Sequence, residues 1–238
     1  MIKPAAIPPS PFHRGEQHVQ QRQGVRQQME RFGQQVIRRH MPEQHRQFYG
    51  QLPFVFVGHS DASGRPWASI LFNKPGFIQS SDAKHLTIHA APVAGDPLGD
   101  ALKADTRLGL LGIELPTRRR NRLSAHIIDT TPESIHLGID QAFGNCPQYI
   151  QSRALRTLDT ENQPAIDIND LAVLDDRAQT LITRSDTFFV ASAIDGNSAD
   201  VQSGADVSHR GGMPGFVRID NATTLTIPDY LGNNHFNT

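Results

Sequence analysis

The sequence predicts a mainly β protein with flanking helices, an α+β fold, from three observations. Strand-sized apolar segments broken by turn residues fill most of residues 54–140. An amphipathic helical pattern precedes them. The stretch PGFIQSSDAKHLTI, residues 75–88, recurs without a gap as PGFVRIDNATTLTI, residues 214–227. We therefore expect two copies of one β unit.

The composition favours a soluble globular protein. Of the 238 residues, 37% are hydrophobic and 20% are charged, and the formal net charge is −1. This balance gives no reason to expect a nucleic acid or a membrane as partner. The single cysteine, Cys146, excludes an internal disulfide and is compatible with a reducing compartment. No stretch resembles a signal peptide or a membrane span, so we expect a cytoplasmic protein.

Residues 1–50 are expected to form an N-terminal arm and an amphipathic helix. Residues 1–15 are rich in proline and are expected to be irregular. From Glu16 to about His40, apolar residues spaced four, three and four apart form one helical stripe: Val25, Met29, Phe32 and Val36. The arginines on the other face are expected to be solvated.

Residues 51–152 are expected to form a first barrel. Phe54–Val57 and Trp67–Phe72 flank the turn sequence DASG, which predicts a hairpin. Short strands broken by turns are typical of a barrel or sandwich, and the further ones are expected in GFIQS, HLTIHA, LGLLGIEL, NRLSAHIIDTT and SIHLGI. Pro147 is placed as the first residue of a helix.

Residues 153–187 are expected to form a helical linker, with its helix in LDDRAQTLITRSD. Residues 188–238 then form the N-terminal part of a second barrel, beginning with the strand in TFFVASA. The counterparts of LGLLGIEL and NRLSAHIIDTT are missing from this second copy, which would leave strand edges unpaired. We therefore expect the chain to be a fragment, or to receive the missing strands from a partner.

Several of these stretches resemble one family. GRPWAS, PGF, GDPL, LGLLGIELPTRRRNRLS and FGNCPQYIQ are similar to the pyridoxamine 5′-phosphate oxidase-like, FMN-binding split-barrel superfamily, and most of all to its double-barrel bacterial branch. DTFFVASA, DVSHRGGMPGFVRI and LTIPDYLGNNHFNT resemble its single-barrel members. The resemblance implies tandem split barrels, the second incomplete, with FMN in a cleft between the two units. It also implies a homodimer.

The resemblance assigns the FMN phosphate to the stretch VSHRGGMPGFVR. A phosphate needs cations or N–H donors in a partly desolvated groove, and glycine lets the backbone approach an anion closely. The residues expected to bind the cofactor here are Ser208, His209, Arg210, Gly211, Gly212, Pro214 and Arg218. A glycine-rich turn with solvated arginines is the alternative interpretation.

Further cofactor ligands are implied outside this stretch. Asn233, Asn237 and Thr238 carry short polar groups suited to a phosphate or a ribityl hydroxyl, although an Asn-rich turn would look the same. The resemblance also places Arg122 near the cleft, facing the flavin of the second copy; a solvated strand arginine is the alternative. In the first copy Leu71 stands in the place of Arg210, so that copy is expected to bind no cofactor.

Other candidate groups are given no role in the chemistry. Cys146 is interpreted as a buried structural thiol. The basic run TRRRNR, residues 117–122, lacks a surrounding basic field and an RNA-binding signature, so nucleic acid is not expected. No HExxH or CxxC spacing occurs, so no metal site is expected.

These observations favour an FMN-binding oxidoreductase related to pyridoxamine 5′-phosphate oxidase. It would transfer hydride or electrons through the flavin to an unknown small molecule or redox-protein partner. No catalytic acid or base is identifiable, and the substrate stays open because fold does not fix chemistry. The alternative is a non-catalytic module that carries or senses flavin, haem or another flat cofactor, or that docks a reductase.

Overall fold

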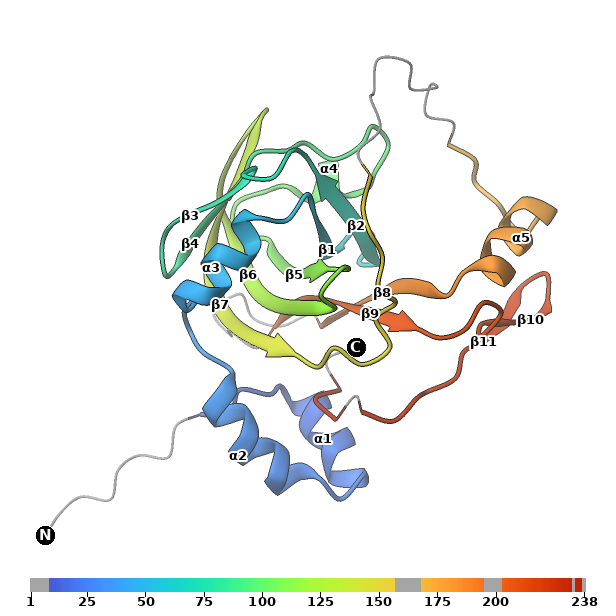
Figure 1. The fold of residues 1–238 in the computed structure, drawn as a ribbon, viewed down its shortest axis with the longest axis horizontal. Helices are drawn as coiled ribbons and strands as arrows, with labels where there is room; N and C mark the ends of the chain where they lie inside the picture. Colours follow the sequence, from blue (N-terminus) through green and yellow to red (C-terminus); the bar gives the residue numbers. More distant parts are fainter. Residues whose placement is uncertain (1–8, 157–167, 195–202, 233, 237–238) are drawn as a thin grey trace, which may run out of the picture.

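The computed structural model describes residues 9–156, 168–194, 203–232 and 234–236. Antiparallel strands form most of the regular structure, and short helices flank them (Figure 1). The mainly β, α+β architecture is therefore confirmed. Among the described helices, none is both long and apolar enough to cross a bilayer.

Seven antiparallel strands form the main sheet. In chain order they are β1 (Phe54–Ser60), β2 (Pro66–Phe72), β3 (Ile78–Asp82), β4 (His85–Ile88), β5 (Arg107–Glu114), β6 (Arg119–Thr131) and β7 (Ser134–Asn145). Their order across the sheet is β2-β1-β5-β6-β7-β4-β3. The sheet curls (Figure 1), and Asn73 near one edge donates a hydrogen bond from Nδ2 to the backbone oxygen of His89 at 3.0 Å. All the strands predicted for the first unit are present.

The first hairpin owes its register to local turn chemistry. Asp61 accepts hydrogen bonds from the backbone N–H groups of Ser63 at 2.8 Å and Arg65 at 2.9 Å. Gly64 follows with φ of +79°, a conformation that glycine adopts without strain. The strands then pair from Phe54 opposite Phe72. The turn predicted from DASG is confirmed.

The core lies inside the curl of the sheet. The longest strands, β6 and β7, change register between Ser124 and Ala125 and between Ile127 and Asp129. Such bulges bend a strand and raise its twist, which lets the sheet wrap around its inward-facing side chains. These side chains are almost fully buried and include Val57, Leu71, Ile78, Leu86, Leu110, Leu123, Ile127 and Leu137. An unpredicted helix, α3 (Glu43–Gly50), adds Phe48 and Tyr49 to the core.

The single helix expected from Glu16 to about His40 is wrong. Two helices occur instead, α1 (Arg14–Arg22) and α2 (Arg26–Val36). They are separated at Gly24, whose φ of +72° no right-handed helix can continue. The apolar stripe did not reveal this break because it begins at Val25, directly after Gly24, and so says nothing about residues 16–24.

The helix expected at Pro147 is also absent. Residues 147–150 form a turn in which the N–H of Ile150 donates to the backbone oxygen of Pro147 at 3.3 Å. Tyr149 has φ of +66°, which is incompatible with a helix at that residue. Proline permits a helix to begin but does not enforce one. The linker helix is confirmed as α5 (Asp176–Arg184), which Asp175 caps by accepting from the N–H of Ala178 at 2.7 Å.

The C-terminal part forms two separate hairpins. β8 (Thr187–Ile194) pairs with β9 (Gly204–Gly211), and β10 (Arg218–Asn221) pairs with β11 (Thr224–Thr226). Within the described ranges, no further strand joins these hairpins into a second barrel. The β8–β9 hairpin packs on the main sheet, where β9 contacts β1 and β5, and β8 contacts β1 and β2 (Figure 1).

The two similar stretches, residues 66–88 and 205–227, adopt a similar local structure. When Pro75 is aligned with Pro214, the strands β9, β10 and β11 begin at or next to the positions that β2, β3 and β4 predict. The turn between the second and third strands is also matched. Phe77 donates to the backbone oxygen of Lys74 at 3.2 Å, and Phe216 donates to that of Met213 at 2.9 Å. Gly76 and Gly215 within these turns both have positive φ, +96° and +83°.

Candidate anion-binding site

The β8–β9 hairpin approaches the sheet closely at two glycines. A Cβ atom on Gly58 of β1 would lie 2.6 Å from the backbone oxygen of Asp206. One on Gly109 of β5 would lie 2.5 Å from both the oxygen of Ala205 and the Cα of Asp206. Any side chain at these positions would push the backbones apart. Glycine at both positions therefore sets how deeply β9 docks.

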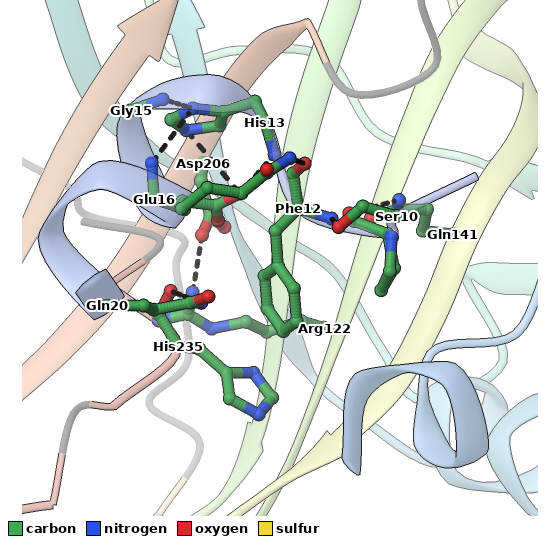
Figure 2. A network of polar contacts seen from close by, with 12 residues as sticks. Ser10, Phe12, His13, Gly15, Glu16, Gln20, Arg122, Gln141, Asp206 and His235 are labelled. Atoms are coloured by element: carbon green, nitrogen blue, oxygen red, sulfur yellow. Dashed lines mark hydrogen bonds and ion pairs between the residues drawn. The ribbon is translucent and has the colours of Figure 1, made fainter. Parts of the chain in front are cut away.

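An ion pair ties the docked hairpin to β6. The Arg122 side chain, only 3% of the residue being exposed, contacts the half-buried carboxylate of Asp206 and the hydroxyl of Ser208. Figure 2 shows Arg122 and Asp206 directed at one another. Burial raises the pKa of the Asp206 carboxyl, and the charge of Arg122 opposes that shift. Removing one partner of such a pair leaves the other charge buried without a counter-ion, which is strongly destabilising.

Three arginines converge on a pocket of about 60 Å³ beside this pair. Arg120 and Arg122 come from β6, and Arg210 comes from β9. Burial, together with the charges of Arg122 and Arg210, lowers the pKa of Arg120 to about 10, although arginine keeps its charge at neutral pH. Asp206 and Asp229 offset only part of this charge. We call this the arginine pocket; the rest of its wall comes from residues 145–146, 148–149, 209, 211, 216 and 228–232.

Buried nitrogens in the wall of the arginine pocket lack hydrogen-bond partners. His209 is 3% exposed, and its Nδ1 lies 3.4 Å from Nη1 of Arg120. Among the described residues, nothing accepts from or donates to Nε2 of His209, Nε of Arg120 or Nε of Arg122. Leaving such a group unsatisfied costs about 1–3 kcal/mol. These nitrogens have almost no accessible surface, so a bound acceptor reaches them only if the wall rearranges; the charge of the arginines is what favours an anion in the pocket.

Stability is expected to depend on the protonation of His209. Burial, together with the charges of Arg120 and Arg210, lowers the pKa of His209 from 6.5 to about 4. The unfolded chain therefore takes up a proton first as the pH falls. The stability associated with the neutral ring is complete above pH 6.5 and is lost as the pH falls towards 4. Between pH 7.5 and pH 5 this loss is about 2 kcal/mol.

Urea unfolding at these two pH values measures the effect. We expect His209→Gln to lose roughly 2 kcal/mol less than the wild type between pH 7.5 and pH 5. His18→Gln is the matched control, because His18 is exposed on α1. Equal pH dependence in His209→Gln and His18→Gln would contradict the assignment.

A second cavity, of about 350 Å³, shares Asn145, Cys146 and Gly232 with the arginine pocket. We call it the aromatic cavity, because its wall includes Phe32 of α2 and His235. The ring of His235 packs against Phe12, Phe32 and Phe143, with ring centroids 5.5–5.8 Å apart. Burial, with the charge of Arg122, lowers the pKa of His235 to about 4, so that its ring is neutral at pH 7. A positive site and a largely apolar one thus lie side by side.

The N-terminal arm closes over a third cavity, of about 330 Å³. Gln20 donates to the backbone oxygen of His235 at 3.2 Å, and Gln141 donates to that of Pro11 at 3.1 Å (Figure 2). The carboxylates of Glu16 and Asp206 line this cavity. Their charge disfavours an anion, so the smaller arginine pocket is the better candidate for a phosphate.

The structure brings about half of the predicted cofactor residues together. Four of them, His209, Arg210, Gly211 and Arg122, line the arginine pocket, and Ser208 contacts Arg122 at its edge. Ser208 to Gly211 belong to strand β9, so the alternative of a glycine-rich turn is wrong for these residues.

The remaining predicted residues lie elsewhere. Gly212 follows β9, and its backbone oxygen accepts from Gln151 at 3.0 Å. Pro214 lies in the exposed turn beyond it, and Arg218 pairs with Asp220 at 2.6 Å on β10. None of these three lines the arginine pocket. Asn233, Asn237 and Thr238 lie outside the described residues.

Two residues of the candidate site were not predicted, and one prediction is corrected. Arg120 is two residues from Arg122 on a strand, so the two-residue period of strands could have placed it on the same face. No sequence pattern pointed to Asp206, because its partner Arg122 lies 84 positions away. Cys146 is exposed rather than buried. It lies directly after the end of β7 and before the turn at residues 147–150.

Comparisons with known proteins add little. No protein-family model matches the chain, and no curated protein matches it. Among solved structures, HupZ of Group A Streptococcus aligns with a TM-score of 0.35 and 10% identity, over 44% of this chain and 94% of that one. A variant of HupZ gives 0.35 and 8%, over 44% and 99%. An F420 reductase gives 0.31 and 11%, over 42% and 95%. Likenesses this weak carry no argument about this chain.

Proposed function

We propose that this chain binds FMN and transfers hydride or electrons through it. One observation carries the proposal: the arginine pocket adjoins the aromatic cavity. FMN has a dianionic phosphate at one end and a flat ring system at the other. It therefore needs a cationic and a largely apolar environment side by side.

The two sites divide the cofactor between them. At about 60 Å³ the arginine pocket accommodates a phosphate but not the ring system. Arg120, Arg210 and the backbone of Gly211 are the donors for that phosphate. The aromatic cavity, at about 350 Å³, falls in the size range of pockets for flat organic ligands. When bound, the flavin would supply the redox chemistry, and these residues would hold it and exclude water.

We also propose that the two β units are tandem copies that act as partners. Phe56 pairs with Ile70 across the first hairpin, and Phe189 pairs with His209 across the second. The alignment of the two copies matches Ile70 with His209, so Phe56 and Phe189 occupy equivalent positions. Their rings stack with centroids 3.5 Å apart. Contact between equivalent residues is typical of a two-fold axis, here an approximate one within one chain.

A flavin titration tests the proposed site. We expect Arg210→Gln to weaken FMN binding about 10- to 100-fold, because a charge-assisted hydrogen bond contributes about 1.5–3 kcal/mol. Arg218→Gln is the matched control: this arginine lies eight positions later, exposed on β10, and is absent from the pocket wall. Quenching of flavin fluorescence gives both affinities. Equal affinities for the two variants would contradict the phosphate site.

Reduction of the bound flavin tests whether the cofactor is redox-active in the site. An oxidoreductase is expected to give a yellow complex that bleaches with a reductant and recovers in air. We propose that the flavin exchanges electrons with a small molecule or a redox protein, and that the chain forms a homodimer.

A second candidate function is that of a non-catalytic haem carrier or sensor. It is favoured by His235, whose neutral imidazole lines the aromatic cavity. A neutral imidazole is a common haem-iron ligand, and arginines pair well with propionates. The same titration with haem discriminates the two. A Soret band that His235→Ala removes, together with no FMN binding, would favour this candidate.

A further inference from the structure

Cys146, the only cysteine in the sequence, lies at the boundary of the two sites described above. It lines both the arginine pocket and the aromatic cavity. The turn after β7 holds it there, where its backbone N–H donates to Oδ1 of Asn145 at 3.0 Å. Arg120 lies within electrostatic range of its sulfur. An exposed thiol therefore faces a concentrated positive charge.

A second, independent observation indicates that this charge is built for a ligand. Arg122 and His209 also line the arginine pocket, and each is 3% exposed. Each keeps a buried nitrogen, Nε and Nε2 respectively, without a partner among the residues that the structure describes. A wall that rearranges around a group with acceptor oxygens would satisfy these nitrogens. A thiol reagent carrying carboxylates would supply such oxygens.

We propose that Cys146 is a thiol–disulfide exchange site selective for small anionic disulfides, the class to which glutathione disulfide belongs. The thiolate of Cys146 attacks one sulfur of the disulfide, and a new S–S bond forms as the old one breaks. The departing thiolate leaves with the electron pair and takes up the proton that Cys146 released. The disulfide is the only oxidant, and it is consumed. The carboxylates of the adduct pair with the arginines.

The adduct has a consequence for ligand binding. It occupies the arginine pocket and adds negative charge there, so other anions are expected to bind less well. The redox state of one thiol would then control the site. This inference depends on the charge of the pocket and not on FMN being its ligand.

Labelling kinetics test the proposal without any cofactor. We compare dithionitrobenzoate, an anionic disulfide, with dithiodipyridine, which is uncharged at neutral pH. In the wild type, raising the salt from about 20 mM to about 500 mM should slow the anionic reagent about tenfold and leave the neutral one unchanged. Arg120→Gln should lower the ratio of anionic to neutral rate about tenfold. Arg118→Gln, exposed two residues away and absent from the pocket wall, should keep the ratio.

Each of these measurements has an outcome that would overturn the proposal. A ratio that is the same in Arg120→Gln and Arg118→Gln, or a wild-type rate with the anionic reagent that does not respond to salt, would overturn the proposal. If Arg120→Gln fails to fold, both reagents accelerate together, and the salt response of the wild type alone decides. Incubation with glutathione disulfide should add one glutathione at Cys146, seen by intact mass, and no adduct would also overturn it. Loss of FMN binding with the charge-selective labelling retained would contradict the proposed function only.

Discussion

Replacing Arg122 with methionine is expected to destabilise the fold by about 3–5 kcal/mol, the range for breaking a buried ion pair. The Asp206 carboxylate would stay half-buried beside β6 without its counter-ion, and the hydroxyl of Ser208 would lose its contact with Arg122. The expected result is a lower midpoint of urea unfolding. Methionine keeps most of the length of the arginine side chain, so lost packing contributes little.

A double substitution separates the charge effect from other causes. Arg122→Met combined with Asp206→Leu removes both charges and should recover a large part of the lost stability. Arg118→Met, on the exposed turn before β6, is the control and should leave the midpoint within about 0.5 kcal/mol of the wild type. If the double variant is as unstable as the sum of the single ones, the pair does not hold the hairpin.

The second large effect is expected from Gly109→Ala. The new Cβ would lie 2.5 Å from backbone atoms of Ala205 and Asp206, which cannot rotate away as a side chain can. Relief requires β9 to move off β5, at a cost of about 3 kcal/mol or more. Because Arg210 belongs to β9, the arginine pocket opens as well. We therefore expect loss of stability and loss of anion binding together.

Amide hydrogen exchange in β9 measures this undocking directly. Protection of the β9 amides should fall in Gly109→Ala while that of β6 and β7 is largely retained. Gly99→Ala is the matched control, because no atom lies within 4 Å of a Cβ built there and its φ is not positive. Unchanged protection of β9 in Gly109→Ala would show that the close approach does not control docking.

Local chemistry explains which predictions succeeded. The β1–β2 hairpin follows from a turn in which Asp61 caps neighbouring N–H groups, so a few adjacent residues determine it. The helix in LDDRAQTLITRSD begins at its own cap, Asp175. The break at Gly24 was missed because a glycine inside an amphipathic pattern is tolerated in many helices. Pro147 was misleading in a similar way. Proline permits a helix to begin, but the positive φ of Tyr149 prevents one here.

The candidate site was predictable mainly where its residues are close together in the sequence. Arg210 and Gly211 were predicted through the family resemblance of the stretch VSHRGGMPGFVR, and both line the arginine pocket. Their partners on β6 were harder to find, because the contact of Arg122 with Asp206 depends on how the second hairpin docks. No local pattern reports a contact across 84 positions. The exposure of Cys146 was missed as well, because the residues next to a cysteine in the sequence do not determine its burial.

Leu71 and Arg210 stand at matching places in the two hairpins, yet they meet opposite surroundings. Leu71 is 1% exposed and packs in the hydrophobic core, whereas Arg210 lines the arginine pocket with Arg120 and Arg122. The same position thus fills the core in one hairpin and lines the arginine pocket in the other. Such a division of labour predicts a binding stoichiometry of one anion per chain, where two identical subunits would offer two.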